Sequence, residues 1–191
     1  MEESILLVDD EQSVISALKR ALMDEPYTIH TANSGVEGLR ILKEQKIKVI
    51  VSDEMMPGMK GNELLSTVKN LFPETIRIML TGHASIQAAM QAVNSGEIYR
   101  FFAKPWNDVE IQLSIRSALE KYNLEEENKQ LLKTVKHQAG ELKDIEKKYP
   151  GITSIEKDEM GNVVLTDIPD SDKNLSDVIS EIVGQTSTDK S

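Results

Sequence analysis

Five short apolar runs, each separated from the next by a segment with helical periodicity, constrain the fold of this chain more than any other feature. The runs are rich in Ile, Val, Leu and aromatic residues and span Ile5–Val8, Tyr27–Ala32, Val49–Val51, Ile76–Leu80 and Tyr99–Ala103. Strands that are buried on both faces of a sheet have this composition. Between the runs, apolar residues recur at three- and four-residue spacing, as in an amphipathic helix. The alternation predicts an α/β domain with a doubly wound, five-stranded parallel sheet that helices cover on both sides.

Side chains that can carry chemistry lie at the ends of four of the five runs. Asp9 and Asp10 follow the first run, Asp53 lies just past the third, Thr81 follows the fourth and Lys104 follows the fifth. The carboxyl ends of parallel strands lie along one edge of a sheet, and in strand order 2-1-3-4-5 the first and third strands are neighbours. We therefore expect three carboxylates to meet at that edge, with a hydroxyl and an ammonium group beside them.

The chemistry expected of this set is phosphoryl transfer. Three clustered carboxylates repel one another unless a cation lies among them, and Mg²⁺ is the expected cofactor because it takes oxygen ligands and suits phosphate chemistry. A carboxylate beside Mg²⁺ can attack a phosphoryl donor, and it needs no general base because it is already ionised at neutral pH. We expect one of the three carboxylates to be the nucleophile, while Lys104 and Thr81 stabilise the charge that develops on the phosphoryl oxygens.

Each of these residues also has a purely structural interpretation. An Asp that follows a strand often caps the next helix, which suits Asp9 or Asp10 taken singly. A Lys before Pro is commonly a solvated surface residue, and Thr followed by Gly at positions 81–82 is typical of a turn. Their joint occurrence at corresponding strand ends favours the phosphoacceptor interpretation.

The motifs around these residues resemble those of receiver domains in two-component response regulators. The matching stretches are LLVDD at 6–10, SDEMMPGMKG at 52–61, TGHA at 81–84 and FFAKPW at 101–106. The resemblance covers about residues 3–121 and implies a flavodoxin-like fold with a phosphoacceptor at Asp53. It also implies that a sensor histidine kinase supplies the phosphoryl group.

The resemblance assigns finer roles to the same residues. It implies that Asp10 is the closer Mg²⁺ ligand, that Asp9 acts through water, and that the Met55 carbonyl completes the protein ligands. Thr81 would sense the phosphoryl group, and Phe101 would be the aromatic rotamer switch, although an aromatic residue there also suits the core. His83 would flank the path of the hydrolytic water or be a solvent-exposed loop residue. The bond from Lys104 to Pro105 is often cis in this family.

A second pattern begins at Asp108 and remains helical to about Tyr149, without a proline. Its later part carries a heptad seam with Asn at one core position, a device of parallel two-stranded coils; the seam comprises Leu124, Asn128, Leu131, Val135, Gln138, Leu142, Ile145 and Tyr149. We predict a receiver domain at 1–121, a helical or coiled-coil extension at 122–149 and a homodimer. The alternative is a single amphipathic helix that lies on its own domain.

The last segment, residues 150–191, is an acidic tail with a possible hairpin between 152 and 168 and a short helix after it. The tail carries 9 acids and 3 bases, against a net charge of −10 for the whole chain. Because nucleic-acid phosphates would repel such a tail, we expect no DNA binding. The expected downstream partner is an unknown protein that the helix and tail contact.

Composition limits the remaining functions. The chain has no cysteine, which excludes disulfides and thiol nucleophiles. It shows no secretory signal and no apolar stretch long enough to span a bilayer, so we expect a cytoplasmic protein without membrane contact. An Asp-nucleophile phosphatase of the haloacid-dehalogenase type is disfavoured, because Met55 stands where that family has a second acid. A coiled-coil scaffold with a weakly active receiver is the other alternative. Beyond self-catalysed phosphorylation and dephosphorylation of Asp53, no enzyme activity is expected.

Overall fold

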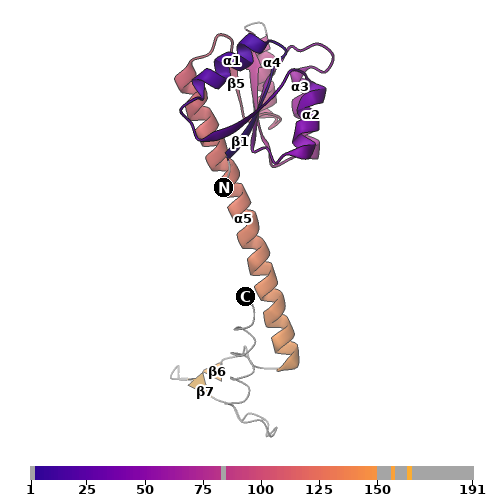
Figure 1. Cartoon of the computed structure of the whole chain (residues 1–191). Coiled ribbons are helices and arrows are strands. Elements are labelled where there is room, and N and C mark those ends of the chain that lie inside the picture. The colour runs from indigo at the N-terminus through magenta and orange to yellow at the C-terminus, as the bar shows by residue number, and fades with distance from the viewer. Residues whose placement is uncertain (1–2, 83–84, 150–155, 158–162, 165–191) are drawn as a thin grey trace. The chain divides into compact units, whose positions relative to one another are not determined.

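The computed structural model describes residues 3–82, 85–149, 156–157 and 163–164. The chain divides into two compact units, Met1–Lys133 and Thr134–Ser191. The first unit contains five strands, β1 (Glu3–Val8), β2 (Tyr27–Ala32), β3 (Val49–Asp53), β4 (Ile76–Thr81) and β5 (Arg100–Ala103) (Figure 1). Its helices are α1 (Gln12–Ala21), α2 (Gly35–Glu44), α3 (Gly61–Leu71), α4 (Ile86–Asn94) and the first part of α5 (Asp108–Lys148).

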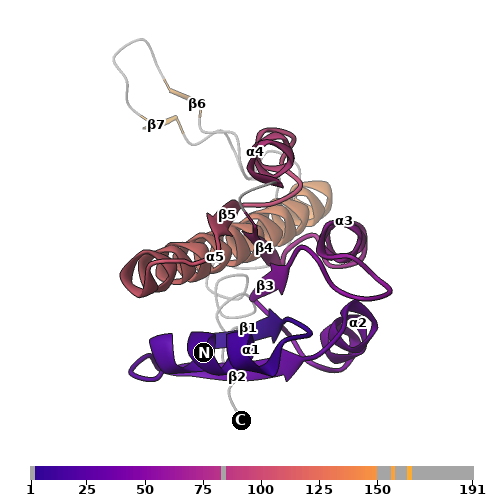
Figure 2. The same cartoon turned by 90° about the horizontal axis from the view of Figure 1, so that it is seen from above.

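The strands form one parallel sheet in the order β2-β1-β3-β4-β5, as the sequence predicts (Figure 2). The chain crosses from β1 to β2 on one side and continues through β3, β4 and β5 on the other. This reversal lies between β1 and β3, whose carboxyl ends are therefore adjacent. The flavodoxin-like fold class is confirmed.

Two apolar cores lie on the two faces of the sheet. One core packs alternate strand residues against α1 and α5, and the other packs the intervening strand residues against α2, α3 and α4. On β4, for example, Ile78 and Leu80 belong to the first core and Met79 to the second. Side chains alternate in this way along a strand, and burial on both faces explains why each strand is an apolar run in the sequence.

Helix α5 has two stripes of apolar residues on opposite sides. In its first part, Ile111, Ile115, Ala118 and Tyr122 are buried against the sheet. Further along, Leu124 and other apolar residues of the seam are exposed. At 3.6 residues per turn, Leu124 lies about 200° around the helix from Tyr122. The seam is therefore not a continuation of the stripe that packs on the sheet.

The start of the exposed part of α5 is fastened at the amino edge of the sheet. The Lys48 ammonium donates to Glu3 Oε2 at 3.1 Å and to Asn123 Oδ1 at 2.9 Å, and Asn123 also donates to Glu3 at 3.1 Å. An ion pair between Lys129 and Glu74 lies one to two turns further along the helix. These contacts join α5 to the first residue of β1 and to the segments that precede β3 and β4.

In the second unit, β6 (Glu156–Lys157) pairs antiparallel with β7 (Val163–Val164). The helix expected after them lies outside the described residues. Among the residues that are described, no helix combines the length and apolarity that a bilayer crossing requires.

Candidate functional site

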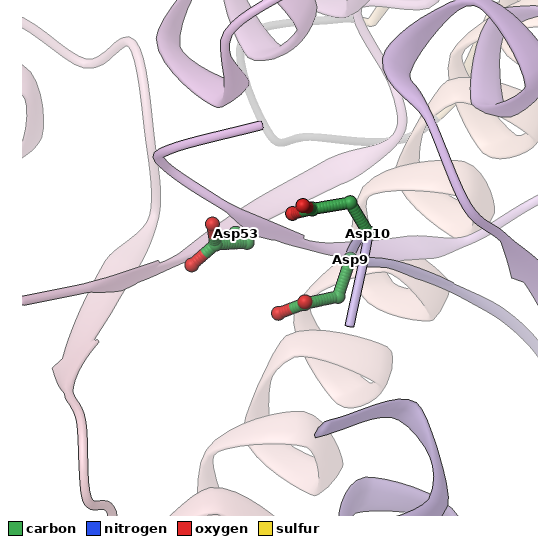
Figure 3. Close-up of side chains that lie close together, drawn as sticks. All are labelled: Asp9, Asp10 and Asp53. Atoms are coloured by element: carbon green, nitrogen blue, oxygen red, sulfur yellow. The ribbon is translucent and has the colours of Figure 1, made fainter. Parts of the chain in front are cut away.

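The three acidic side chains expected at the carboxyl edge of the sheet lie together there (Figure 3). Asp9 and Asp10 directly follow β1, and Asp53 is the last residue of β3. Each offers a carboxylate oxygen, and these oxygens all lie within 4.8 Å of one another. Asp9 and Asp53 are buried, whereas Asp10 is exposed. The cluster is therefore closed to solvent where Asp9 and Asp53 lie, and it is open on the side of Asp10.

Lys104, which follows β5, bridges two of these acids. Its ammonium group lies 2.6 Å from Asp53 Oδ1 and 2.9 Å from Asp9 Oδ2. Backbone N–H groups complete the shell, since Glu11 donates to Asp9 Oδ1 at 2.8 Å and Met55 donates to Asp53 Oδ2 at 2.9 Å. The contact from Glu11 shows that Asp9 fastens the turn that leads into α1. Asp9 does not cap the helix, because Glu11 is the N-cap residue of α1 and no side chain caps it.

The pKa values of Asp9 and Lys104 are shifted by burial and by hydrogen bonds within the cluster. Burial raises the pKa of the Asp9 carboxyl, although its hydrogen bonds to Lys104 and Glu11 oppose that rise. Burial also disfavours the charge on Lys104, but hydrogen bonds to Asp53 and Asp9 outweigh it and raise the pKa of the ammonium group. Lys104 therefore remains a fixed positive charge between two acids.

The backbone beneath Asp53 is packed against the start of α3. A Cβ atom added to Gly61 would lie 1.8 Å from the Asp53 carbonyl oxygen. The Gly61 N–H donates to the Glu54 carbonyl at 2.9 Å, and the Glu54 N–H donates to Leu80 O at 2.9 Å. The end of β3 is thus fixed from both sides, and only a residue without a side chain fits at position 61.

Thr81, the last residue of β4, is fully buried, and its hydroxyl lies 2.5 Å from Glu54 Oε2 and 3.1 Å from the Gly82 carbonyl oxygen, either of which can accept its proton. Because side chains alternate along β4, Thr81 lies on the face of Met79, which is the face of α3 and α4. Phe101 is half-buried and packs against the core on that same face. The structure therefore places Thr81 and Phe101 on one face and the bridging Lys104 with the acids.

Sequence reasoning did not single out Glu54. Its side chain was overlooked because its contact with Thr81 depends on strand register. Asp53 is opposite Leu80 in the β3–β4 ladder, so the residues that follow them, Glu54 and Thr81, lie side by side. The β3–β4 register, together with polar residues at both of these positions, is the signal that could have identified the contact.

The Lys104–Pro105 peptide bond is cis. Met55 is 63% exposed and contributes the backbone N–H contact to Asp53. His83 lies outside the described residues.

The donor set of the cluster suits a hard divalent cation. Carboxylate oxygens are the ligands that Mg²⁺ prefers, and an open side leaves room for the waters that it retains. Asp9, Asp10 and Asp53 are the described residues that would hold such an ion.

A model of the response regulator receiver domain matches residues 5–116 of the chain. The chain belongs to this family. Hydrogenase transcriptional regulatory protein HoxA of Cupriavidus necator is 34% identical over 124 residues, which are 65% of this chain and 26% of that protein. This receiver therefore spans about a quarter of the length of the curated relatives that it matches first.

Solved structures show the same similarity. A chain described as the adenylate cyclase from Rhodopirellula baltica has a TM-score of 0.66 and 36% identity, covering 70% of this chain and 98% of that one. The signal receiver domain of an HD domain-containing protein from Pseudomonas fluorescens has a TM-score of 0.61 and 36% identity, covering 64% of this chain and 98% of that one. The receiver resemblance is confirmed, and the chain is homologous to response regulators of two-component signalling.

Proposed function

We propose that this receiver accepts a phosphoryl group on Asp53 from a sensor histidine kinase and passes the signal on through protein contacts. The observation that carries the proposal is the cluster of three carboxylates with Lys104 between Asp53 and Asp9. A purely structural cluster would match its acids with bases, whereas this one retains an excess of negative charge on its open side. Such an excess favours a divalent cation, which can then neutralise the charge of an incoming phosphoryl group.

In the proposed transfer, a carboxylate oxygen of Asp53 attacks the phosphorus of a phosphohistidine. An oxygen–phosphorus bond forms as the bond from phosphorus to the imidazole nitrogen breaks, and the electron pair remains on the imidazole. Lys104 lies 2.6 Å from Asp53 Oδ1 and can neutralise charge on the incoming oxygens. When bound, Mg²⁺ supplies further charge neutralisation. Asp9 and Asp10 would hold the ion together with Asp53, and the Met55 carbonyl is the fourth proposed ligand.

Phosphorylation converts the singly charged Asp53 carboxylate into an acyl phosphate that carries about 1.5 to 2 negative charges and three acceptor oxygens. Thr81 is the proposed donor to those oxygens, and Phe101 is the proposed aromatic residue that changes rotamer with it. Both lie on the α3–α4 face of the sheet, as described above. The modification would shift the populations of two conformations of that face, which downstream proteins contact.

The test is phosphorylation of the full chain with acetyl phosphate and Mg²⁺. We expect one added phosphoryl group that is labile at alkaline pH in the parent protein and none in Asp53→Asn. Asp24→Asn, a change at an exposed acid, is the matched control and should be phosphorylated as the parent is. A phosphoryl group that persists in Asp53→Asn would overturn the assignment.

We also propose that α5 forms a parallel homodimer through its seam. Leu124 and Leu131 are 59% and 56% exposed, so neither packs on the sheet of its own chain. Leu142 is 55% exposed. Burying a Leu side chain is worth roughly 1.5–3 kcal/mol, and a second copy offers the same stripe.

Sedimentation equilibrium of the full chain at tens of micromolar tests the dimer. Leu131→Asp combined with Leu142→Asp should give a monomer, because charges at core positions oppose helix association. Lys136→Asp combined with Lys143→Asp changes the outer face and should leave the dimer intact. A monomeric parent protein, with and without phosphorylation, would contradict the proposal.

The alternative functions make different predictions. A phosphatase would turn over free phosphate esters, but Met55 supplies no acid to assist departure of the product. A scaffold with a weakly active receiver would retain its dimer and its partners in Asp53→Asn. We expect a comparison of pull-downs with and without beryllofluoride to identify the protein that recognises the phosphorylated state.

A further inference from the structure

The hydroxyl of Thr81 already has a carboxylate partner in the receiver. Thr81 Oγ1 lies 2.5 Å from Glu54 Oε2, which is shorter than its 3.1 Å contact with the Gly82 carbonyl. Hydrogen bonds from a hydroxyl to an ionised carboxylate are among the shortest and strongest in proteins. The proposed sensor of phosphorylation is therefore engaged while Asp53 is unmodified.

The backbone holds Glu54 in place for this contact. Its N–H is bonded to Leu80 O and its carbonyl accepts from the Gly61 N–H, both at 2.9 Å. Strand register sets Glu54 beside Thr81, on the face that also carries Phe101. The carboxylate reaches the hydroxyl from a fixed point, so the contact is a property of the fold.

A threonine hydroxyl has a single proton to donate. The role proposed for Thr81 requires that this proton be donated to an oxygen of the phosphoryl group on Asp53. Glu54 and the phosphoryl group are therefore competing acceptors for one donor.

We propose that Glu54 is a positioning residue that holds the Thr81 hydroxyl in the unmodified state and thereby sets how readily the receiver switches. This inference rests on the proposed function, because it supposes that Thr81 senses a group on Asp53. Glu54 acts on the switch in two ways. It retains the proton of Thr81, which is the larger contribution, and its negative charge opposes the approach of an anionic group to the adjacent Asp53, which is the smaller one.

The test measures binding of beryllofluoride, an anion that mimics the phosphoryl group, to the full chain by calorimetry at saturating Mg²⁺. Glu54→Ala should bind it about tenfold more tightly than the parent, a change of about 1.4 kcal/mol. Glu54→Gln, which retains an acceptor oxygen but loses the charge, should give a smaller gain. Glu63→Ala removes an exposed carboxylate from the first turn of α3 and should not alter the affinity.

A double-mutant cycle separates positioning from simple charge repulsion. If Glu54 acts through Thr81, most of the gain from Glu54→Ala disappears when Thr81→Ala is already present. An equal gain with and without the Thr81 hydroxyl would overturn the inference, as would unchanged or weaker binding in Glu54→Ala.

A second measurement does not depend on Asp53 chemistry. Three-bond NMR couplings from the backbone nitrogen and carbonyl carbon to the Thr81 methyl carbon report its χ1 angle. We expect one rotamer in the unmodified parent and averaging or a different rotamer in Glu54→Ala. Identical couplings in the two proteins would refute the inference even if beryllofluoride binds. Failure of the parent to bind beryllofluoride, with altered couplings in the variant, would refute the proposed function and leave the contact between Glu54 and Thr81 established.

Discussion

Acids and lysines gather at both edges of the receiver sheet, but the two edges differ in how their charges are matched. At the carboxyl edge, Asp9 and Asp53 share Lys104, and the exposed Asp10 adds a further negative charge. At the amino edge, Lys48 pairs with Glu3, and the neutral Asn123 bonds to both. The first edge retains unbalanced charge, whereas the second is neutral within its own contacts.

This contrast separates two kinds of buried charge cluster in this fold. A matched cluster satisfies its own hydrogen bonds and stabilises the packing of the helix beside it. An unmatched cluster costs free energy unless something binds there. Residue type alone does not separate the two edges, because each has a lysine between oxygen acceptors. The excess of carboxylates at one edge is what marks that edge as the proposed binding site.

Replacing Lys104 should have the largest effect of any lysine substitution at the two edges. Lys104→Met removes the cation nearest Asp53, so we expect phosphorylation by acetyl phosphate to slow by roughly 10²–10³-fold, as when one charge-stabilising donor is removed from an active site. Lys60→Met, at an exposed position before α3, should retain the parent rate. Rates are measured by quenched time courses and mass spectrometry. A rate within threefold of the parent would remove Lys104 from the chemistry.

At the matched edge, the same change from Lys to Met should lower the stability of the fold and leave phosphorylation almost unchanged. Lys48→Met removes the ammonium group that Glu3 and Asn123 share and leaves the Glu3 charge unmatched, so we expect a loss of about 2–4 kcal/mol in unfolding free energy. Urea denaturation measures the loss, and Lys19→Met on the exposed face of α1 serves as its control. Phosphorylation of the folded variant should remain within twofold of the parent rate. A large loss of phosphorylation without a loss of stability would break the distinction between the two edges.

Mg²⁺ should stabilise the fold through the unmatched edge. At a concentration ten times its dissociation constant, a ligand that binds only the folded state adds about 1.4 kcal/mol. For a chain of this size that corresponds to a rise of roughly 3–6 °C in Tm. Calorimetric scans of Asp10→Asn should show a much smaller rise, whereas Asp24→Asn should respond as the parent does. An equal rise in all three proteins would place the ion elsewhere.

The smallest effect is expected for an exposed lysine at the matched edge. The Lys46 side chain is 68% exposed, and its ammonium group lies 3.9 Å from Glu126. Lys46→Met should therefore cost less than about 1 kcal/mol in unfolding free energy, since exposed ion pairs contribute little and salt screens them. Comparing it with Lys48→Met by urea denaturation tests whether burial, and not charge pairing, sets the stability of this edge. Equal losses in the two variants would show that burial does not set the stability of this edge.

Much of the site could be predicted because it depends on local sequence signals. Strands buried on both faces are apolar runs, so the residues that end them, such as Asp53 and Lys104, are identifiable before the fold is known. The parallel topology then brings those ends to one edge. The long helix could be predicted from Asp108 onward because no proline interrupts its periodicity.

The rest depends on contacts between segments far apart in the chain. Glu54 meets Thr81 only because β3 and β4 pair in a particular register. Lys48 reaches Asn123 across 75 positions of sequence, and nothing local at either residue indicates the other. Apolar patterns determine which segments are strands, but the partners of polar side chains follow from how those strands are aligned.

The close packing at Gly61 has a consequence for how this protein can vary. Because a Cβ atom there would overlap the carbonyl oxygen of Asp53, even alanine requires the end of β3 to move. In a library that samples every substitution, position 61 should accept glycine alone, while the exposed neighbour Asn62 accepts most residues. Selection for stability and selection for phosphotransfer would act on that position together, so a lineage that lost the activity would still be held to glycine there.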